Sequence, residues 1–135
     1  MGYAIHMRYL GIDYGAKRVG VALSDEAGDF AFPLVVLENT DQLVSEIISI
    51  CRKQDVGVVV VGDSKDFSQK ENEIMKEVTP FAKVLQDMLG VPVYMHPEFM
   101  TSIEAERLQG KNDMHDASAA AIILKSYLET IKNKQ

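Results

Sequence analysis

Two short apolar runs on either side of a polar turn, near the start of the chain, constrain its fold most. The runs, residues 8–12 and 19–23, are rich in aliphatic side chains, and Gly15 lies in the turn between them. This pattern predicts two neighbouring antiparallel strands. Asp13 ends the first run, so its carboxylate should lie at the rim of a sheet, partly withdrawn from water. An unpaired carboxylate there is costly, so we expect Asp13 to meet a cation, a hydrogen-bond donor or a metal ion.

Taken alone, this stretch has two interpretations. Asp, Gly and Lys are ordinary residues of hairpin turns, so a purely structural turn explains it about as well as a functional site does. Lys17 and Arg18 add positive charge to the turn, where they are either solvated or in contact with phosphate. Acidic residues further along the chain favour the functional interpretation, with both cations as phosphate contacts.

Length and composition predict one domain. The chain has 135 residues, of which 47% are hydrophobic, so we expect a single compact domain over 7–132. Residues 1–6 precede a second methionine, and we expect them to be an expression remnant or a disordered start. Cys51, the single cysteine, lies in an apolar helical pattern and should be a buried, reduced thiol in a cytoplasmic protein. The longest apolar run, over 56–61, is far too short to span a bilayer.

The formal net charge of −6 argues against a protein that coats nucleic acid non-specifically, because such affinity comes mainly from neutralised phosphates. It does not exclude a nuclease. Carboxylates clustered in an active site add negative charge, while local lysines and arginines can still face a substrate backbone.

Helices and strands alternate after the opening hairpin. The pattern predicts a turn over 25–29, a strand over 30–37, a helix that ends at 52–54, a strand over 56–61, a loop over 62–68, a helix over 72–89, a strand over 91–95, a short helix over 100–108, a loop over 110–112 and a helix over 115–131. Pro33 should mark a sheet edge or a bulge, and Pro80 should kink or split its helix. Thr40 or Asp41 should cap the first helix.

This order of elements predicts an α/β fold, with a mixed sheet and helices on both of its faces. Sites in such sheets form at the carboxyl ends of strands, where Asp13 and Glu98 are both expected. Asp116 falls in the first turn of the last helix. Mg²⁺ prefers hard oxygen ligands, so carboxylates from separate elements predict a metal site. Two such ions about 3.5–4 Å apart can activate a water and stabilise the leaving oxygen of a phosphodiester.

Each acid also has an ordinary explanation. Glu98 alone is typical of a surface carboxylate after a strand, and Asp116 alone of an acid favoured by the helix dipole. Together with Asp13 they favour the metal site. Asp113 is more typical of a helix cap, and His96 and His115 of surface residues or neighbours of the site.

Three motifs, in order along the chain, resemble those of a known family. They are Gly11-Ile12-Asp13-Tyr14-Gly15 with Lys17-Arg18-Val19-Gly20-Val21-Ala22; Glu98 with Thr101-Ser102 and Glu104-Ala105; and Asp116-Ala117 with Ala119-Ala120 and Ile123-Leu124 to Tyr127-Leu128. The chain resembles the YqgF, or RuvX, family, known as Holliday junction resolvases, from Met7 to Leu128. This resemblance implies an RNase H-like fold with a mixed five-stranded sheet.

The resemblance also implies a function. It implies a nuclease that depends on Mg²⁺ or Mn²⁺, with two ions held by Asp13, Glu98 and Asp116. The implied task is trimming the 5′ end of pre-16S rRNA, the resolvase activity being the older assignment. We expect nucleic-acid contacts from Lys17, Arg18, Thr101 and Ser102, with Thr101 primarily a helix cap whose free amides hold a phosphate. Expected partners are an rRNA precursor or branched DNA, and ribosomal particles, with no membrane; the chain should be a monomer or a weak homodimer.

The chain departs from the family pattern at two motifs. Gly62-Asp63-Ser64 replaces the Gly-Leu-Pro that commonly ends the central strand. Pro97-Glu98-Phe99 replaces the usual Asp-Glu-Arg, so an acid and an arginine are missing beside the expected ligand. This favours a second hypothesis, a non-catalytic nucleic-acid or ribosome-binding module. A third hypothesis is a phosphotransferase, because turns like that over 13–18 also occur in sugar kinases and actin-like ATPases. It ranks last, since this short domain has no second half to enclose ATP.

Overall fold

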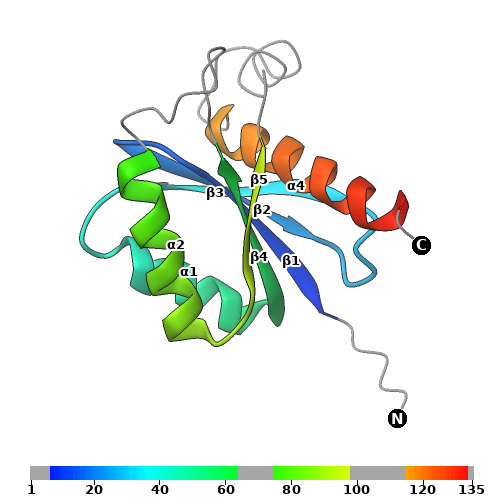
Figure 1. Cartoon of the computed structure of the whole chain (residues 1–135), viewed down its shortest axis with the longest axis horizontal. Helices are drawn as coiled ribbons and strands as arrows, with labels where there is room; N and C mark the ends of the chain where they lie inside the picture. The colour runs from blue at the N-terminus through cyan, green and yellow to red at the C-terminus, as the bar shows by residue number, and fades with distance from the viewer. Residues whose placement is uncertain (1–6, 64–74, 98–114, 134–135) are drawn as a thin grey trace.

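The structure, a computed structural model, describes residues 7–63, 75–97 and 115–133 of the chain. Its strands form one five-stranded sheet in the order β3-β2-β1-β4-β5 (Figure 1). The first two pairings, β1 with β2 and β2 with β3, are antiparallel, whereas β1 with β4 and β4 with β5 are parallel. The elements are β1 (Arg8–Tyr14), β2 (Arg18–Ser24), β3 (Ala31–Glu38), α1 (Leu43–Lys53), β4 (Val56–Asp63), α2 (Met75–Leu89), β5 (Val93–Pro97) and α4 (His115–Asn133).

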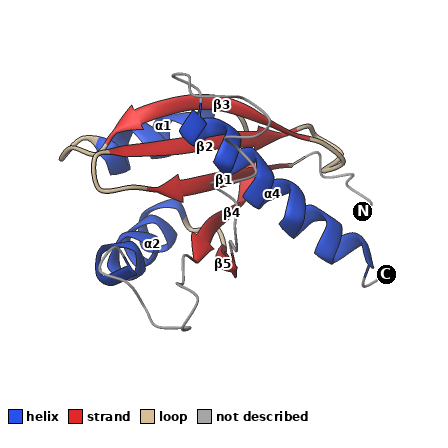
Figure 2. Cartoon of the chain, turned by 90° about the horizontal axis from the view of Figure 1, so that it is seen from above, coloured by secondary structure: helices blue, strands red, loops and turns tan. Residues whose placement is uncertain are grey.

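Helices cover both faces of the sheet, as predicted. One core cluster packs α1 and α2 against one face, and a second packs α4 against the other (Figure 2). The alternation of β4 shows why two cores form: Val59 and Val61 belong to the first cluster, and Val58 and Val60 to the second. The prediction of a central strand over 56–61, buried on both faces, is therefore confirmed.

The edge strand β3 contains both features predicted from its proline. It lies at one end of the strand order, where a missing backbone N–H is tolerated. Its pairing with β2 shifts, because Val21 pairs with Val35 while Ala22 pairs with Pro33, which leaves Leu34 as the extra residue of a bulge. The proline is thus both at an edge and beside a bulge.

Several predicted boundaries are wrong. Gln42, with no side-chain cap, is the N-cap of α1; Thr40 Oγ1 instead accepts a hydrogen bond from the Gln42 backbone N–H at 3.1 Å, in the turn before the helix. Pro80 lies inside α2 and does not split it, because the helix continues from Met75 to Leu89. The strands β4 and β5 end at Asp63 and Pro97, two residues later than predicted. The predicted helix over 100–108 and the loop over 110–112 fall outside the described residues.

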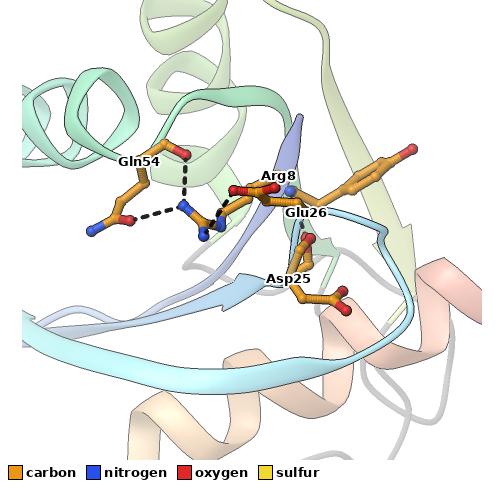
Figure 3. Close-up of polar contacts among 6 residues, drawn as sticks. Arg8, Asp25, Glu26 and Gln54 are labelled. Atoms are coloured by element: carbon orange, nitrogen blue, oxygen red, sulfur yellow. Dashed lines mark hydrogen bonds and ion pairs between the residues drawn. The ribbon is translucent and has the colours of Figure 1, made fainter. Parts of the chain in front are cut away.

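Polar contacts hold the amino end of β1. Arg8 Nη1 donates to Gln54 Oε1 at 3.3 Å, and Arg8 Nη2 lies 3.6 Å from Glu26 Oε1 (Figure 3). The backbone N–H of Tyr9 donates to Ser24 Oγ at 2.8 Å. These contacts fix the end of β1 that lies opposite the predicted site. None of the helices in the described part of the chain combines the length and the apolar composition that a membrane crossing requires.

Burial makes the thiol of Cys51 unreactive, and this gives a first prediction. Its side chain is only 3% exposed, and burial raises its pKa to about 11. Because the thiolate is the reactive form, only about one thiol in a thousand would be ionised at pH 8. We expect an aromatic disulfide reagent to react with the native protein far more slowly than with the protein in concentrated urea, as measured by absorbance. A native rate close to that of free cysteine would contradict this.

Candidate active site at the carboxyl end of β1

Asp13 lies one residue before the end of β1, on the face of the sheet that α4 covers. The neighbouring side chains of Leu10 and Ile12 belong to the opposite core, with α1 and α2. Gly11 faces α4 so closely that a Cβ there would lie 2.8 Å from Leu124 Cβ. Because side chains alternate along a strand, Asp13 shares the face of Gly11. Its side chain is partly buried, as predicted for a carboxylate at the rim of the sheet.

Glycines flank Asp13 on both neighbouring strands. Gly20 of β2 is its direct partner. On the other side, Ile12 pairs with Val61, so Gly62 is the residue of β4 next to Asp13. Both glycines are buried and share the face of Asp13 by strand alternation. The neighbours of Asp13 on both adjacent strands are therefore glycines, which carry no side chain.

The helix α4 begins near Asp13. The ring of Tyr127 lies 6.1 Å from that of Tyr9, whereas Ala120 lies against Gly11, so α4 runs opposite to β1. From Gly11 to Asp13 is about 6.6 Å of strand, and four residues of helix back from Ala120 rise about 6 Å. The first turn of α4, with the backbone of Asp116, therefore approaches the end of β1. It also lies at the end of the molecule where β4 and β5 finish (Figure 1).

A buried hydroxyl without a partner lies in the same part of α4. Ser118 is 5% exposed, and its Oγ has no hydrogen-bond partner among the described residues. An unsatisfied buried hydroxyl costs about 1–3 kcal/mol, so such a group usually meets a ligand or an ordered water. Two residues of helix turn a side chain by about 200°, so Ser118 does not share the face of Ala120, which lies against Gly11.

The turn over residues 15–18, which we call the basic turn, is held by two hydrogen bonds from Asn39. The Asn39 side chain donates to the Gly15 carbonyl oxygen at 2.8 Å, and its backbone N–H donates to that of Lys17 at 2.9 Å. A Cβ on Gly15 would lie 2.5 Å from the Arg18 carbonyl oxygen, so the turn requires glycine. Asn39 was not predicted from the sequence, although asparagine is a common turn residue. The turn borders a surface hollow of about 580 Å³, lined by Ala16, Lys17, Arg18, Glu38, Asn39 and Thr40.

Arg18 shares the face of Asp13. Its neighbour Val19 belongs to the α1 and α2 core, so Arg18 and Gly20 are directed to the other side of the sheet. Both Lys17 and Arg18 are exposed. The geometry therefore places Arg18, a predicted phosphate contact, on the same face as Asp13, the predicted metal ligand. Arg18 lies two residues before Gly20, the strand partner of Asp13.

The family follows from a comparison with known proteins. A family model described as "RuvX: Holliday junction resolvase" matches residues 7–130. The chain belongs to the RuvX family. A relative from Syntrophus aciditrophicus, named "Putative pre-16S rRNA nuclease", is 36% identical, with 96% of this chain and 93% of the relative covered. A relative of the same name from Maridesulfovibrio salexigens is 35% identical, with 90% and 98% covered.

Solved structures show that the fold of this RuvX chain is RNase H-like. RuvC from Thermus thermophilus, in complex with a Holliday junction substrate, matches with a TM-score of 0.61 at 20% identity, covering 94% of this chain and 96% of that one. The resolvase of fowlpox virus, in complex with Holliday junction DNA, matches with a TM-score of 0.59 at 12% identity, covering 93% and 99%. The predicted fold class is therefore confirmed.

Some predicted site residues of this RuvX chain are not placed. Glu98, Thr101 and Ser102 lie outside the described residues, as does the side chain of Asp116. Over 7–63, 75–97 and 115–133 no three side chains of His, Cys, Asp or Glu form a group that could hold a metal ion. Since neither Glu98 nor the Asp116 carboxylate belongs to the described part, the predicted three-acid site remains a prediction.

Proposed function

We propose that this chain is a metal-dependent nuclease that cleaves phosphodiester bonds near the 5′ end of pre-16S rRNA. The observation that supports it most is the place of Asp13. This carboxylate lies on the face that α4 covers, between Gly20 and Gly62, and the first turn of α4 approaches it. Ligand sites in open α/β sheets form at the carboxyl ends of the strands, which is where this carboxylate lies.

The residues of this region fit Mg²⁺ or Mn²⁺. Such ions take oxygen ligands, and Asp13, Glu98 and Asp116 supply carboxylates from three separate elements. When bound, two such ions would supply an activated water and stabilise the leaving oxygen. In sequence, Glu98 directly follows Pro97, the last residue of β5.

The basic turn would position the substrate. Lys17 and Arg18 would bind the phosphate backbone next to the cleaved bond, since Arg18 shares the face of Asp13. The two hydrogen bonds from Asn39 keep the turn in one conformation, so little ordering is needed when the phosphate binds. Thr101 and Ser102 are proposed as further contacts, at a helix amino end where free N–H groups favour an anion.

The names of the relatives support RNA as the substrate. Those named "Putative pre-16S rRNA nuclease" are 31–36% identical to this chain. We further propose one domain over 7–132, in agreement with the family match over 7–130. Ribosomal particles in the cytoplasm would then be its setting, with the chain a monomer or a weak homodimer.

A second candidate function is a binding module that no longer cleaves. Pro97 ends β5 where the family usually has an acid, and Phe99 takes the place of an arginine. These changes remove a negative charge and a phosphate contact beside Glu98. A module of this kind would bind precursor RNA equally well with and without divalent metal.

One assay decides between these functions and gives a second prediction. The purified chain is incubated with a 5′-extended 16S rRNA precursor and, separately, with a four-way DNA junction, in Mn²⁺, in Mg²⁺ or in EDTA. We expect the precursor to be cleaved with metal and to remain intact in EDTA, and cleavage to recover when Mn²⁺ is added back. The reason is that a bound ion would activate the attacking water. Binding of the precursor in EDTA with no cleavage in either metal would support the binding module instead.

A further inference from the structure

Four aromatic rings gather on the face that α4 covers, at the side of β5. We call them the tyrosine platform: Tyr9, Tyr94, His96 and Tyr127. The ring of Tyr127 is central: its centroid lies 6.1 Å from that of Tyr9, 6.0 Å from that of Tyr94 and 5.8 Å from that of His96. The Tyr94 and Tyr127 rings are nearly parallel, with 19° between their planes. Tyr94 is the outermost tyrosine in this group and is 47% exposed.

The platform lies beside the candidate active site. His96 pairs with Gly62, the residue of β4 next to Asp13, so all three lie in one row across the sheet. Two strand spacings separate His96 from Asp13, about 10 Å. Tyr94 lies two residues earlier on the same strand, opposite Val60, whose side chain belongs to the α4 core. The platform and the carboxylate therefore share one face and are about 10–12 Å apart.

Packing alone explains Tyr127 but not Tyr94. The half-buried Tyr127 fills the space between α4 and the sheet. In contrast, α4 lies over the β1 and β2 side of the sheet, and β5 extends beyond it (Figure 2). Tyr94 thus presents an aromatic ring to solvent while Tyr127 supports it from the other side. Large exposed aromatic groups next to a site often mark a binding surface.

The platform contains no lysine, arginine or carboxylate, and a hydrogen bond holds its histidine ring. Burial raises the pKa of Tyr127, with the neighbouring Tyr94 and Tyr9 as further causes. His96 Nε2 is hydrogen-bonded to Ser126 Oγ at 2.9 Å, which fixes the orientation of the ring. For a chain with a net charge of −6, an aromatic stacking surface gains affinity for nucleic acid without relying on phosphate contacts alone.

We propose that Tyr94 stacks on an unpaired base of the nucleic-acid substrate, with Tyr127 as its support. The inference rests on the proposed nuclease function, because it places the substrate backbone at Asp13. A separation of about 10–12 Å puts this base within a few nucleotides of the cleaved phosphate. The site would therefore prefer a single-stranded segment next to the cleavage point over a continuous duplex.

The chain contains no tryptophan, so one introduced tryptophan reports on this site alone. Tyr94→Trp keeps the stacking surface and places the reporter on the platform. Phe30→Trp is the matched control, because Phe30 is 71% exposed next to the turn between β2 and β3. With a single-stranded RNA of about ten nucleotides in EDTA, we expect the tryptophan fluorescence of the Tyr94→Trp protein to be quenched in a saturable way, and that of the Phe30→Trp protein to be unchanged.

A third prediction concerns affinity. Tyr94→Ala should weaken binding of the same RNA by about 5- to 150-fold, the range measured when one stacking aromatic side chain is removed. Tyr94→Phe should bind within about twofold of the wild-type chain, as should Phe30→Ala. Circular dichroism checks that every variant is folded, and Tyr94→Trp keeps the test valid if Tyr94→Ala is not. Unquenched fluorescence of the Tyr94→Trp protein together with unchanged affinity of Tyr94→Ala would overturn the proposal.

The same variants separate this proposal from the nuclease proposal. If Tyr94→Ala cleaves RNA at the wild-type rate and binds it with unchanged affinity, the stacking proposal is wrong and the nuclease proposal still stands. Quenching and weakened binding in a chain that never cleaves RNA would support base stacking by Tyr94 and remove the catalytic proposal.

Discussion

The Asp13→Asn protein should lose metal-dependent cleavage of the rRNA precursor while remaining folded. Asparagine keeps the size of the side chain but removes the charge that holds a divalent cation. Removing a residue that only supports a metal ligand already costs about 10–100-fold, so loss of the ligand itself should cost more than about a hundredfold. Gel assays of precursor cleavage at saturating Mn²⁺ measure this effect. Asp116→Asn should behave in the same way.

Thermal unfolding gives this prediction a second readout. A ligand that binds only the folded state raises the melting temperature, so Mn²⁺ should stabilise the wild-type chain and have little effect on Asp13→Asn. Asp87→Asn is the matched control: its carboxylate lies on the exposed surface of α2, 3.9 Å from Lys83 Nζ, where an ion pair contributes little. It should keep both cleavage and the response to Mn²⁺. Full cleavage by Asp13→Asn would end the assignment of Asp13 as a ligand.

The opening hairpin could be predicted from sequence because its signals are local. The two short apolar runs on either side of Gly15 predict β1 and β2. The end of the first run places Asp13 near the end of a strand. The apolar face of α4 is likewise predicted from helical periodicity. Where the prediction failed, a contact between distant segments decides the structure. For example, the pairing of Val59 N–H with the Pro92 carbonyl oxygen at 3.0 Å helps to place the start of β5 after Pro92.

The site was predictable only in part for the same reason. Asn39 holds the turn at Gly15 from 24 residues away, so no pattern around Gly15 could reveal it. The platform combines Tyr9, Tyr94 and Tyr127 from three distant segments, and each tyrosine alone is an ordinary strand or helix residue. Sequence periodicity identifies the face of the sheet on which a residue lies. The register between strands decides which residues of that face are neighbours.

Gly11 gives the second large effect, because it sets how closely α4 approaches β1. In Gly11→Ala the new Cβ would lie 2.8 Å from Leu124 Cβ and 2.9 Å from the Ala120 carbonyl oxygen. Both atoms belong to the rigid part of α4, so the helix must move. Overpacking of this kind costs about 1–3 kcal/mol of unfolding free energy, measurable by urea denaturation. Since Asp116 lies on α4 and Asp13 on β1, the same movement would separate the two proposed ligands.

Activity should therefore fall by more than the loss of stability explains. A displacement of about 1 Å in a catalytic group can cost about a hundredfold, so we expect Gly11→Ala to cleave about 10–100-fold more slowly at a temperature where it is fully folded. Gly90→Ala is the control: with φ of +71° and nothing within 4 Å of a new Cβ, it strains only its own backbone after α2. It should lose about 1–2 kcal/mol of stability and keep its cleavage rate. Equal rates in the two variants would show that the close packing of α4 on β1 does not position the site.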